Sequence, residues 1–339
     1  MIRYIGTDEM ISILKVVGLG EMIRRISLAI KEDFCRWETF KRSARVAAYF
    51  PAGVVELMPT HDDSLYSFKY VNGHPENTAR GKLSVTAFGV LARAETGYPI
   101  LLSEMTICTA LRTAATSALA AQVLANPDAD TMALIGLGAQ AEFQAIAFGS
   151  LVGIRNLRVY DIDVAAAGKF LSNAARLDLD VQLCSSVEHA LSGAQIVTTA
   201  TGSKRHASVI PPAAVVPGMH LNAIGGDCPG KTELHREILR RSKIFVEYLP
   251  QTRVEGELQL MESDYPAVEL WKVLVGADRG REAVDTITLF DSVGFAVEDH
   301  ATLRVLYEVS EQLGIYSELD LVPETTNSKD LFGLLADIP

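Results

Sequence analysis

The chain has 339 residues, of which 48% are hydrophobic and 22% charged, and its formal net charge is −11. This composition excludes a disordered or low-complexity protein, and the acidic balance disfavours general binding to nucleic acid or to anionic membranes. The length exceeds the size at which one hydrophobic core usually keeps growing, so we expect two domains.

Targeting and redox features predict a cytoplasmic protein without a bound metal. The first residues lack the apolar core of a secretory signal, and no apolar run reaches the roughly 18 residues that a membrane helix needs. The cysteines are widely scattered and form no Cys-x-x-Cys pair, which predicts neither a disulfide framework nor a zinc knuckle; they are Cys35, Cys108, Cys184 and Cys228.

The first third of the chain predicts a helix followed by a sheet. Apolar residues at helical spacing predict one helix over residues 8–36. Within it, the segment Val17-Gly18-Leu19-Gly20 imitates the start of a nucleotide loop, but no strand ending in an acid follows. A hairpin turn at Thr96-Gly97 and short β-rich runs then predict a mostly antiparallel sheet, with strands over residues 54–58, 67–71, 85–91 and 98–102.

The rest of the chain predicts a parallel sheet. An alanine-rich helix runs from residue 109 to about residue 124, and strands then alternate with helices. Residues 295–313 predict one long helix, and residues 319–335 a short tail that returns to the first domain. The later predicted strands cover residues 195–199, 220–224, 244–248 and 286–290.

A glycine turn after an apolar run predicts a dinucleotide site. Gly136 permits the tight strand-to-helix turn, Gly138 lets the backbone approach a pyrophosphate, and the small Ala141 lets the helix pack closely. Asp161 ends the next predicted strand and can accept both ribose hydroxyls. No Arg follows it directly, so we predict NAD rather than NADP. The alternative is an ordinary strand-to-helix turn that binds nothing.

A second motif competes with this interpretation. Residues 225–232 satisfy the phosphate-loop pattern Gly-x-x-x-x-Gly-Lys-Thr, and Asp291 begins a segment that imitates a nucleotide-switch motif. On pattern alone this predicts an NTPase. Against it, the preceding strand comes late in its domain, and Asp227 would face the polyphosphate.

Several longer segments, spread over nearly the whole chain, resemble the ornithine cyclodeaminase and μ-crystallin family. They are KRSARV (41–46), VELMP (55–59), KYVNGHP (69–75), TALRTAA (109–115), NAIGGDCPGKTEL (222–234), IFVEY (244–248), QTR (251–253) and DSVGF (291–295). The resemblance implies a homodimer with an α/β fold: an α+β substrate and dimerisation domain joined to an NAD-binding Rossmann domain. We place the first over residues 1–114 with the returning tail 314–339, and the second over residues 115–313.

The family's reaction, as the resemblance implies it, converts L-ornithine to L-proline and ammonia while NAD is reduced and reoxidised within one turnover. Hydride leaves the α-carbon, the distal amine attacks the resulting imine, ammonia departs, and the hydride returns to the ring. Two alternatives stay open. Lysine cyclodeamination to pipecolate is one, since a methylene is worth only ~1–3 kcal/mol in a pocket. A non-catalytic NAD-dependent binding protein, like some μ-crystallins, is the other.

Substrate contacts are assigned by the same resemblance. Glu56 is expected near the distal ammonium, Asp227 is the expected acid and base, and Val293 is expected to touch the substrate. The donors to the substrate carboxylate are Arg45, Lys69 and Arg112. The structural alternatives are surface salt bridges for the three cations, an exposed strand carboxylate for Glu56, and a turn or capping residue for Asp227.

The resemblance also places NAD beside residues of both predicted domains. Two of these positions depart from the family: Ser84 stands where Thr is common and keeps the hydroxyl, and Ala200 replaces a larger branched residue, which loosens cofactor packing. Besides Gly136, Gly138 and Asp161, the expected NAD contacts are Ser84, Val85, Arg112, Thr113, Ala139, Gln140, Ala200, Ala223, Ile224, Gly225, Gly226, Lys231 and Ser292.

Overall fold

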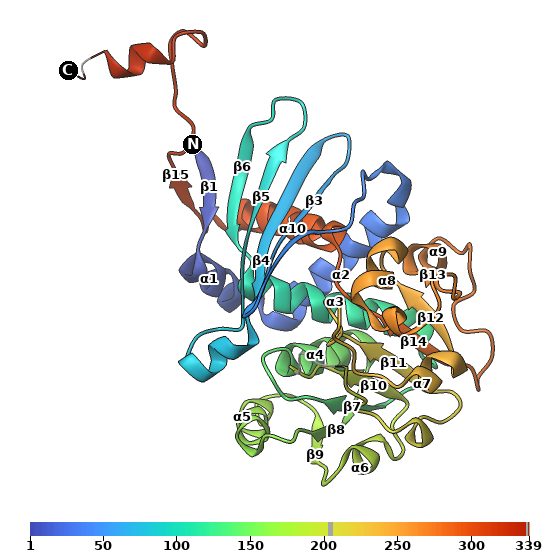
Figure 1. Ribbon diagram of the computed structural model, residues 1–339. Coiled ribbons are helices and arrows are strands. Elements are labelled where there is room, and N and C mark those ends of the chain that lie inside the picture. The colour runs from blue at the N-terminus through green and yellow to red at the C-terminus, as the bar shows by residue number, and fades with distance from the viewer. Residues whose placement is uncertain (203–205, 337, 339) are drawn as a thin grey trace.

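The computed structural model describes residues 1–202, 206–336 and 338, and two β-sheets divide most of these residues between them (Figure 1). In the first sheet β1 runs parallel to β6, and the other neighbouring strands are antiparallel. Its spatial order is β15 (Ser317–Leu319), β1 (Ile2–Ile5), β6 (Pro99–Glu104), β5 (Val85–Arg93), β4 (Leu65–Gly73), β3 (Gly53–His61) and β2 (Val46–Phe50). The predicted mostly antiparallel sheet is confirmed, and β1, β2 and β15 are additions to it.

The second sheet is parallel throughout. Its order is β13 (Val268–Glu269), β12 (Ser242–Val246), β14 (Ile287–Asp291), β11 (His220–Ala223), β10 (Ile196–Thr199), β7 (Thr131–Ile135), β8 (Asn156–Tyr160) and β9 (Asp180–Leu183). The chain runs outward from β7 to β9 and then returns to place β10 on the other side of β7. This reversal is typical of doubly wound dinucleotide-binding folds, so the predicted fold class is confirmed.

Ten α-helices lie within the described residues: α1 (Thr7–Val17), α2 (Leu19–Cys35), α3 (Thr106–Leu124), α4 (Ala141–Ala147), α5 (Val164–Ala174), α6 (Val187–Leu191), α7 (Arg236–Arg241), α8 (Leu249–Glu255), α9 (Leu270–Leu274) and α10 (Ala296–Leu313). Short 3-10 or π turns add η1 (Trp37–Thr39), η2 (Pro75–Arg80), η3 (Phe148–Val152), η4 (Pro212–Ala214), η5 (Glu257–Leu260) and η6 (Phe332–Leu335).

The single helix predicted over residues 8–36 is wrong, because Gly18 divides it into α1 and α2. The φ of Gly18 is +85°, a left-handed conformation that ends one helix and redirects the chain into the next. The apparent nucleotide loop around Gly18 is this helix junction.

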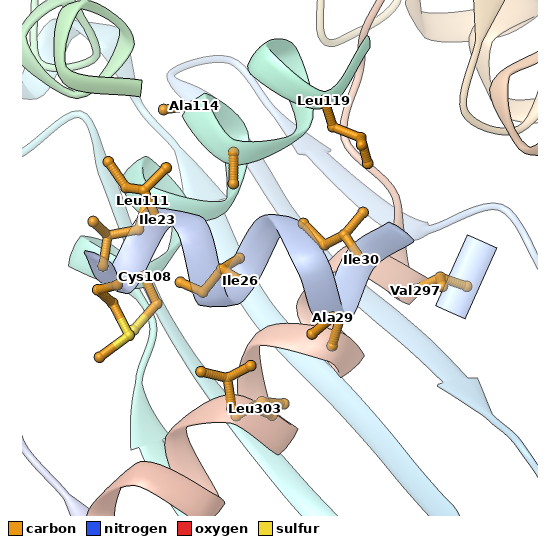
Figure 2. Packing of buried hydrophobic residues seen from close by; sticks show 14 of the residues in the cluster. Ile23, Ile26, Ala29, Ile30, Cys108, Leu111, Ala114, Leu119, Val297 and Leu303 are labelled. Carbon is orange, nitrogen blue, oxygen red and sulfur yellow. The ribbon is translucent and has the colours of Figure 1, made fainter. Parts of the chain in front are cut away.

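Helices α3 and α10 pack against one face of the first sheet, and α2 packs on both of these helices. Ile23 and Ile26 of α2 meet Leu111 of α3 and Leu303 of α10 in a fully buried cluster (Figure 2). By length and mean hydropathy, 1.2, α3 could cross a membrane, but 72% of that stretch is buried inside the protein. Since α3 also contacts β11 and β14, it is the core helix between the two sheets.

An aromatic cluster joins the two halves of the molecule. The ring centroids of Trp271 in α9 and Phe295 before α10 lie 6.3 Å and 5.5 Å from that of Trp37. The predicted domain boundary at residue 313 would place α10 with the parallel sheet, whereas α10 packs on β3, β4 and β5. We therefore propose that α10 is better grouped with the first domain.

The other face of the first sheet carries apolar side chains that are partly exposed to solvent. Leu57, Tyr70 and Phe88 form one row across β3, β4 and β5, and the rings of Tyr70 and Phe88 are stacked 5.1 Å apart. Leu57 and Phe88 are each 43% exposed. Beyond β15, the C-terminal tail extends away from both sheets (Figure 1), with η6 exposed.

Candidate active site

Most residues predicted to bind the dinucleotide lie at the carboxyl edge of the parallel sheet. The strands end at one edge because they run in one direction, and the loops that follow them meet there. The loop after β7 brings Gly136, Gly138, Ala139 and Gln140; the loops after β8, β10, β11 and β14 bring Asp161, Ala200, Ala223 to Gly226, and Ser292.

The glycine loop has the shape that a pyrophosphate requires. The φ of Gly136 is +98°, and a β-carbon there would stand 2.6 Å from the carbonyl oxygen of Ala200, so no side chain fits. A β-carbon on Gly138 would meet nothing within 4 Å, which leaves open space over the backbone. Ala141 is fully buried at the start of α4, against the sheet. These residues fit a dinucleotide.

Asp161 is held beside this loop by two backbone amides. Its Oδ2 accepts a hydrogen bond from the Leu137 amide at 2.6 Å, and its Oδ1 accepts one from the Asp163 amide at 2.8 Å. The carboxylate therefore has a fixed orientation at the end of β8, with lone pairs left for ribose hydroxyls.

The phosphate-loop interpretation is wrong. A phosphate loop delivers its Lys and Thr into the first turn of a helix, whereas here Lys231 and Thr232 lie in a turn and an isolated β-bridge, and α7 begins only at Arg236. The Nζ of Lys231 donates to Oδ1 of Asp227 at 3.0 Å. Lys231 is thereby engaged with the carboxylate of its own loop.

Lys69 and Arg112 form a buried cationic pair backed by acids of α10. The Nζ of Lys69 donates to Oδ1 of Asp299 at 2.7 Å, and Nη1 of Arg112 donates to Oε2 of Glu298 at 2.9 Å. Burial lowers the pKa of Lys69 to about 8, with the Arg112 charge adding to the effect and Asp299 opposing it. Asp299 Oδ2 is buried without a hydrogen-bond partner in the described residues, so it can accept a further hydrogen bond.

Arg45 is bound by the protein on every side of its guanidinium. Its Nη1 donates to Glu56 Oε2 at 3.0 Å, and its Nε lies 3.1 Å from Glu255 Oε2. Its Nη2 donates to the carbonyl oxygens of Val293 and Gly294 at 2.6 Å and 2.8 Å. Arg45 thus connects the segment before β2 with the loop after β14.

Asp227 faces this acidic group, with its side chain 51% exposed. Asp227 is close enough to affect both carboxylates. Burial raises the pKa of Glu56 and the pKa of Glu255, and the negative charge of Asp227 raises both pKa values further. The structure therefore brings together Arg45, Glu56 and Asp227, which the sequence predicts as substrate residues.

Hydrogen bonds to the buried acid Glu247 hold the loop that contains Ser292 and Val293. Glu247 Oε1 accepts from the Ser292 hydroxyl at 2.5 Å and from the Gly294 amide at 3.1 Å. Burial raises the pKa of Glu247. Val293 itself is 6% exposed.

The remaining predicted cofactor residues lie outside the parallel sheet. Arg112 and Thr113 belong to α3, whereas Ser84 and Val85 stand at the start of β5 in the first sheet, where Val85 is exposed. The contacts of Ser84 and Val85 with NAD stay a prediction.

Three buried acids at the site are not singled out by the sequence. Glu255 follows shortly after the quoted segment 251–253 but belongs to no spacing pattern. Glu298 and Asp299 are adjacent acids at the start of an apolar helix, and this placement is a usable signal, because charges on a buried helix face are rare unless paired.

The parallel sheet, the glycine loop with its acid, and the neighbouring cluster of buried cations and carboxylates define a dinucleotide-binding protein with a site for a charged small molecule. Comparison with known proteins identifies the family to which the chain belongs. The chain belongs to the ornithine cyclodeaminase/mu-crystallin family, whose model matches residues 7–313.

Individual relatives cover nearly the whole chain. An ornithine cyclodeaminase of Agrobacterium fabrum is 50% identical over 335 residues, which are 99% of this chain and 95% of that protein. A solved lysine cyclodeaminase, described as recognising L-lysine, L-ornithine and L-2,4-diaminobutyric acid, superposes with a TM-score of 0.92 at 28% identity, covering 98% of this chain and 99% of the other. An archaeal alanine dehydrogenase dimer with bound NAD superposes with a TM-score of 0.85 at 29% identity, covering 95% and 99%.

Proposed function

We propose that this chain is an ornithine cyclodeaminase, which converts L-ornithine to L-proline and ammonia with NAD reduced and reoxidised in each turnover. The observation that carries the proposal is the division of charge in the site. Lys69 and Arg112 supply cations that are paired with acids of α10, and Glu56 and Asp227 supply carboxylates close to each other. A diamino acid has a carboxylate at one end and an ammonium at the other, and the relatives about 50% identical to this chain are ornithine cyclodeaminases.

Each end of the substrate then has its own partners. Arg45, Lys69 and Arg112 bind the carboxylate, and Asp299 and Glu298 keep Lys69 and Arg112 in place. Asp227 takes a proton from the distal ammonium, so that its nitrogen can attack, and returns a proton to the departing nitrogen. Lys231 orients the Asp227 carboxylate through its hydrogen bond.

NAD, when bound, supplies the hydride acceptor that is also the later hydride donor. The glycine loop would hold its pyrophosphate and Asp161 its adenosine ribose. Ala200, Ala223 to Gly226, and Ser292 line the same sheet edge and are proposed contacts. Ile162, directly after Asp161, is 89% exposed and offers an apolar surface for the adenine ring.

Product analysis tests the proposal. Incubation of the protein with catalytic NAD and ornithine should release proline and ammonia in equal amounts without accumulation of NADH. Steady accumulation of NADH would instead identify an amino-acid dehydrogenase, and NAD binding without turnover of any diamino acid would identify a binding protein.

Lysine is the second substrate to test, since the lysine cyclodeaminase above superposes closely and is described as recognising both diamino acids. Assays with ornithine and with lysine under the same conditions distinguish ornithine cyclodeamination from lysine cyclodeamination. A kcat/KM higher for lysine would replace our proposal by pipecolate formation.

We also propose a homodimer and a cytoplasmic location. The uncovered apolar row of Leu57, Tyr70 and Phe88 supports the dimer, because large exposed apolar patches mark interaction surfaces. The scattered cysteines support the location.

A further inference from the structure

Glu233 is a buried acid that the reaction described above does not use. It follows Lys231 by two residues and is 1% exposed. Its Oε1 accepts hydrogen bonds from the Thr201 amide, at 2.6 Å, and from the Thr201 hydroxyl. Its Oε2 accepts one from the Gly225 amide at 3.2 Å. One carboxylate therefore joins the loop after β10 to the loop after β11.

The backbone beside Glu233 holds the same two loops together at a second place. The Val209 amide donates to the carbonyl oxygen of Glu233 at 2.8 Å, and the Ala207 amide donates to that of Thr232 at 2.9 Å. The loop after β10 is thus attached to the segment of Glu233 at its far end as well as at Thr201.

Two more buried acids hold Glu233 itself in place. The two carboxylate oxygens of Glu257 accept from the amides of Glu233 and Leu234 at 2.7 Å and 2.9 Å. Asp291, the last residue of β14, accepts in turn from the amides of Glu257 and Leu258, both at 2.8 Å. Each acid therefore fixes the backbone of the next, and the loops after β10 and β11 are held relative to the end of β14.

The two loops that Glu233 joins lie on the cofactor side of the site. The carbonyl oxygen of Ala200 stands 2.6 Å from where a β-carbon on Gly136 would be, so the loop after β10 lies against the glycine loop. The loop after β11 leads directly to Asp227. In a doubly wound fold each half of the sheet binds one nucleotide. Since Asp161 marks the adenosine half, the nicotinamide half falls to β10, β11 and β14.

Glu233 is closely fitted to the loops that it joins. A β-carbon on Gly225 would collide with the Glu233 carboxylate. Burial raises the pKa of Glu233, while the Thr201 hydroxyl and the charge of Lys231 oppose this rise. A carboxylate has acceptors only, which matches the three donors from Thr201 and Gly225, whereas the amide of a glutamine would place a donor against one of them.

We propose that Glu233 is a positioning residue for hydride transfer: it fixes the loop against the nicotinamide half of NAD relative to the loop that carries Asp227. The identities of the cofactor and the substrate rest on the proposed function. Because a misplacement of about 1 Å can cost on the order of 10²-fold in rate, loosening of this joint should slow hydride transfer. The adenosine contacts at the glycine loop and Asp161 should remain.

Stopped-flow measurement of the first hydride transfer tests this role. NAD-loaded protein is mixed with L-ornithine, or with L-ornithine deuterated at the α-carbon, and the absorbance of the reduced nicotinamide is followed. Glu233→Gln should slow this step about tenfold or more, with a primary isotope effect on the slowed step. Its dissociation constant for NAD should stay within about threefold of the natural value.

The fluorescence of bound NADH gives a readout that does not depend on turnover. In Glu233→Gln the emission maximum of bound NADH should move toward that of the free coenzyme, because the nicotinamide is held less firmly. Glu233→Asp keeps the charge but is one methylene shorter, so it cannot reach both loops. It should show the same two changes.

Asp62→Asn is the matched control. Asp62 is also a buried acid, and its Oδ1 accepts from two amides and a hydroxyl, those of Ser64 and Leu65, in the turn between β3 and β4. Asp62→Asn should lower the melting temperature, leave the rate of hydride transfer within about twofold, and leave the NADH emission unchanged.

Two results would overturn the inference. One is hydride transfer in Glu233→Gln and Glu233→Asp as fast as in Asp62→Asn. The other is a loss of NAD affinity as large as the loss of rate, which would show general disruption of the cofactor site.

Failure of the proposed function has a different signature. If the natural protein accumulated NADH from ornithine, the cyclodeaminase proposal would fall, while the first hydride transfer would still report on Glu233. If it turned over no diamino acid, the emission of bound NADH in the three variants would still decide the role of Glu233.

Discussion

Arg112 occupies the space that a side chain at position 294 would need. A β-carbon on Gly294 would stand 2.4 Å from Nη1 of Arg112, and the φ of Gly294 is +77°, which L side chains rarely adopt. The same Nη1 donates to Glu298, so the guanidinium has little freedom to withdraw. The loop after β14 and the cation on α3 are therefore fitted to each other.

Gly294→Ala should displace Arg112 and raise the KM for ornithine about tenfold or more, since a small misplacement of a binding group is costly. Left-handed strain alone costs roughly 1–2 kcal/mol. Gly314→Ala is the matched control: φ is +64° at Gly314, but a β-carbon there would meet nothing within 4 Å. It should lower the melting temperature and leave the KM unchanged. Equal KM values for both variants would contradict the fit of Arg112 against Gly294.

Asp161→Ala should weaken the binding of NAD and narrow the preference for NAD over NADP. The reason is that the carboxylate binds the ribose hydroxyls and repels a 2′-phosphate. Dissociation constants for both dinucleotides, measured by fluorescence titration, check this. Asp163→Ala is the neighbouring control, since the Asp163 side chain caps α5 through the Ala165 amide. Tighter binding of NADP than NAD by the natural protein would refute the cofactor assignment.

Asp227→Asn should keep NAD affinity within a few-fold and reduce proline formation by at least about 10²-fold, the lower range for loss of a general acid and base. NAD titration and product analysis on the same preparation separate the two effects. Turnover at the natural rate would reject the acid and base role of Asp227.

The stability of the ligand-free protein should fall as the pH rises through about 7. The pKa of Glu255 and that of Asp291 are each raised to about 7, chiefly by burial, so both acids bind protons more tightly when folded. Their contribution is fully present at low pH and is lost as the pH rises through about 7. Glu255→Gln should reduce the fall in melting temperature between pH 6 and pH 8 measured by calorimetry.

Leu57→Asp combined with Phe88→Asp should convert the proposed dimer into a monomer, because buried carboxylates on the uncovered sheet face could not be paired. Light scattering after size-exclusion chromatography measures this. Val284→Asp is the control, since Val284 is 78% exposed and lies in the loop before β14. A natural protein that is monomeric at micromolar concentration would refute the dimer itself.

The parts of this fold that could be predicted are those with local patterns. Alternating strands and helices, the turn at Gly136 and Gly138, and the acid at Asp161 each leave a periodicity or a residue type at a fixed place, and the parallel sheet follows from them. Strands β1 and β15 could not be predicted because they are short and pair over the full length of the chain. The sequence predicts Gly18 inside a helix, because the helical spacing of apolar residues continues across it.

Candidate site residues could be named where a motif surrounds them, as at Glu56, Lys69 and Asp227. Glu255, Glu298 and Asp299 are paired with Arg45, Arg112 and Lys69, which lie far away in the sequence. No local pattern records such pairings, so the acids that balance the cations emerge only from the packed structure.

Arg45 also has a mechanical consequence. It precedes β2 of one sheet, and its Nη2 is bonded to the carbonyl oxygens of Val293 and Gly294 behind β14 of the other. Any hinge motion that widened the gap between the halves would break both bonds and separate the rings around Trp37. These contacts therefore oppose separation of the two halves, while the side chains of Asp227 and Tyr49 beside them are partly exposed to solvent.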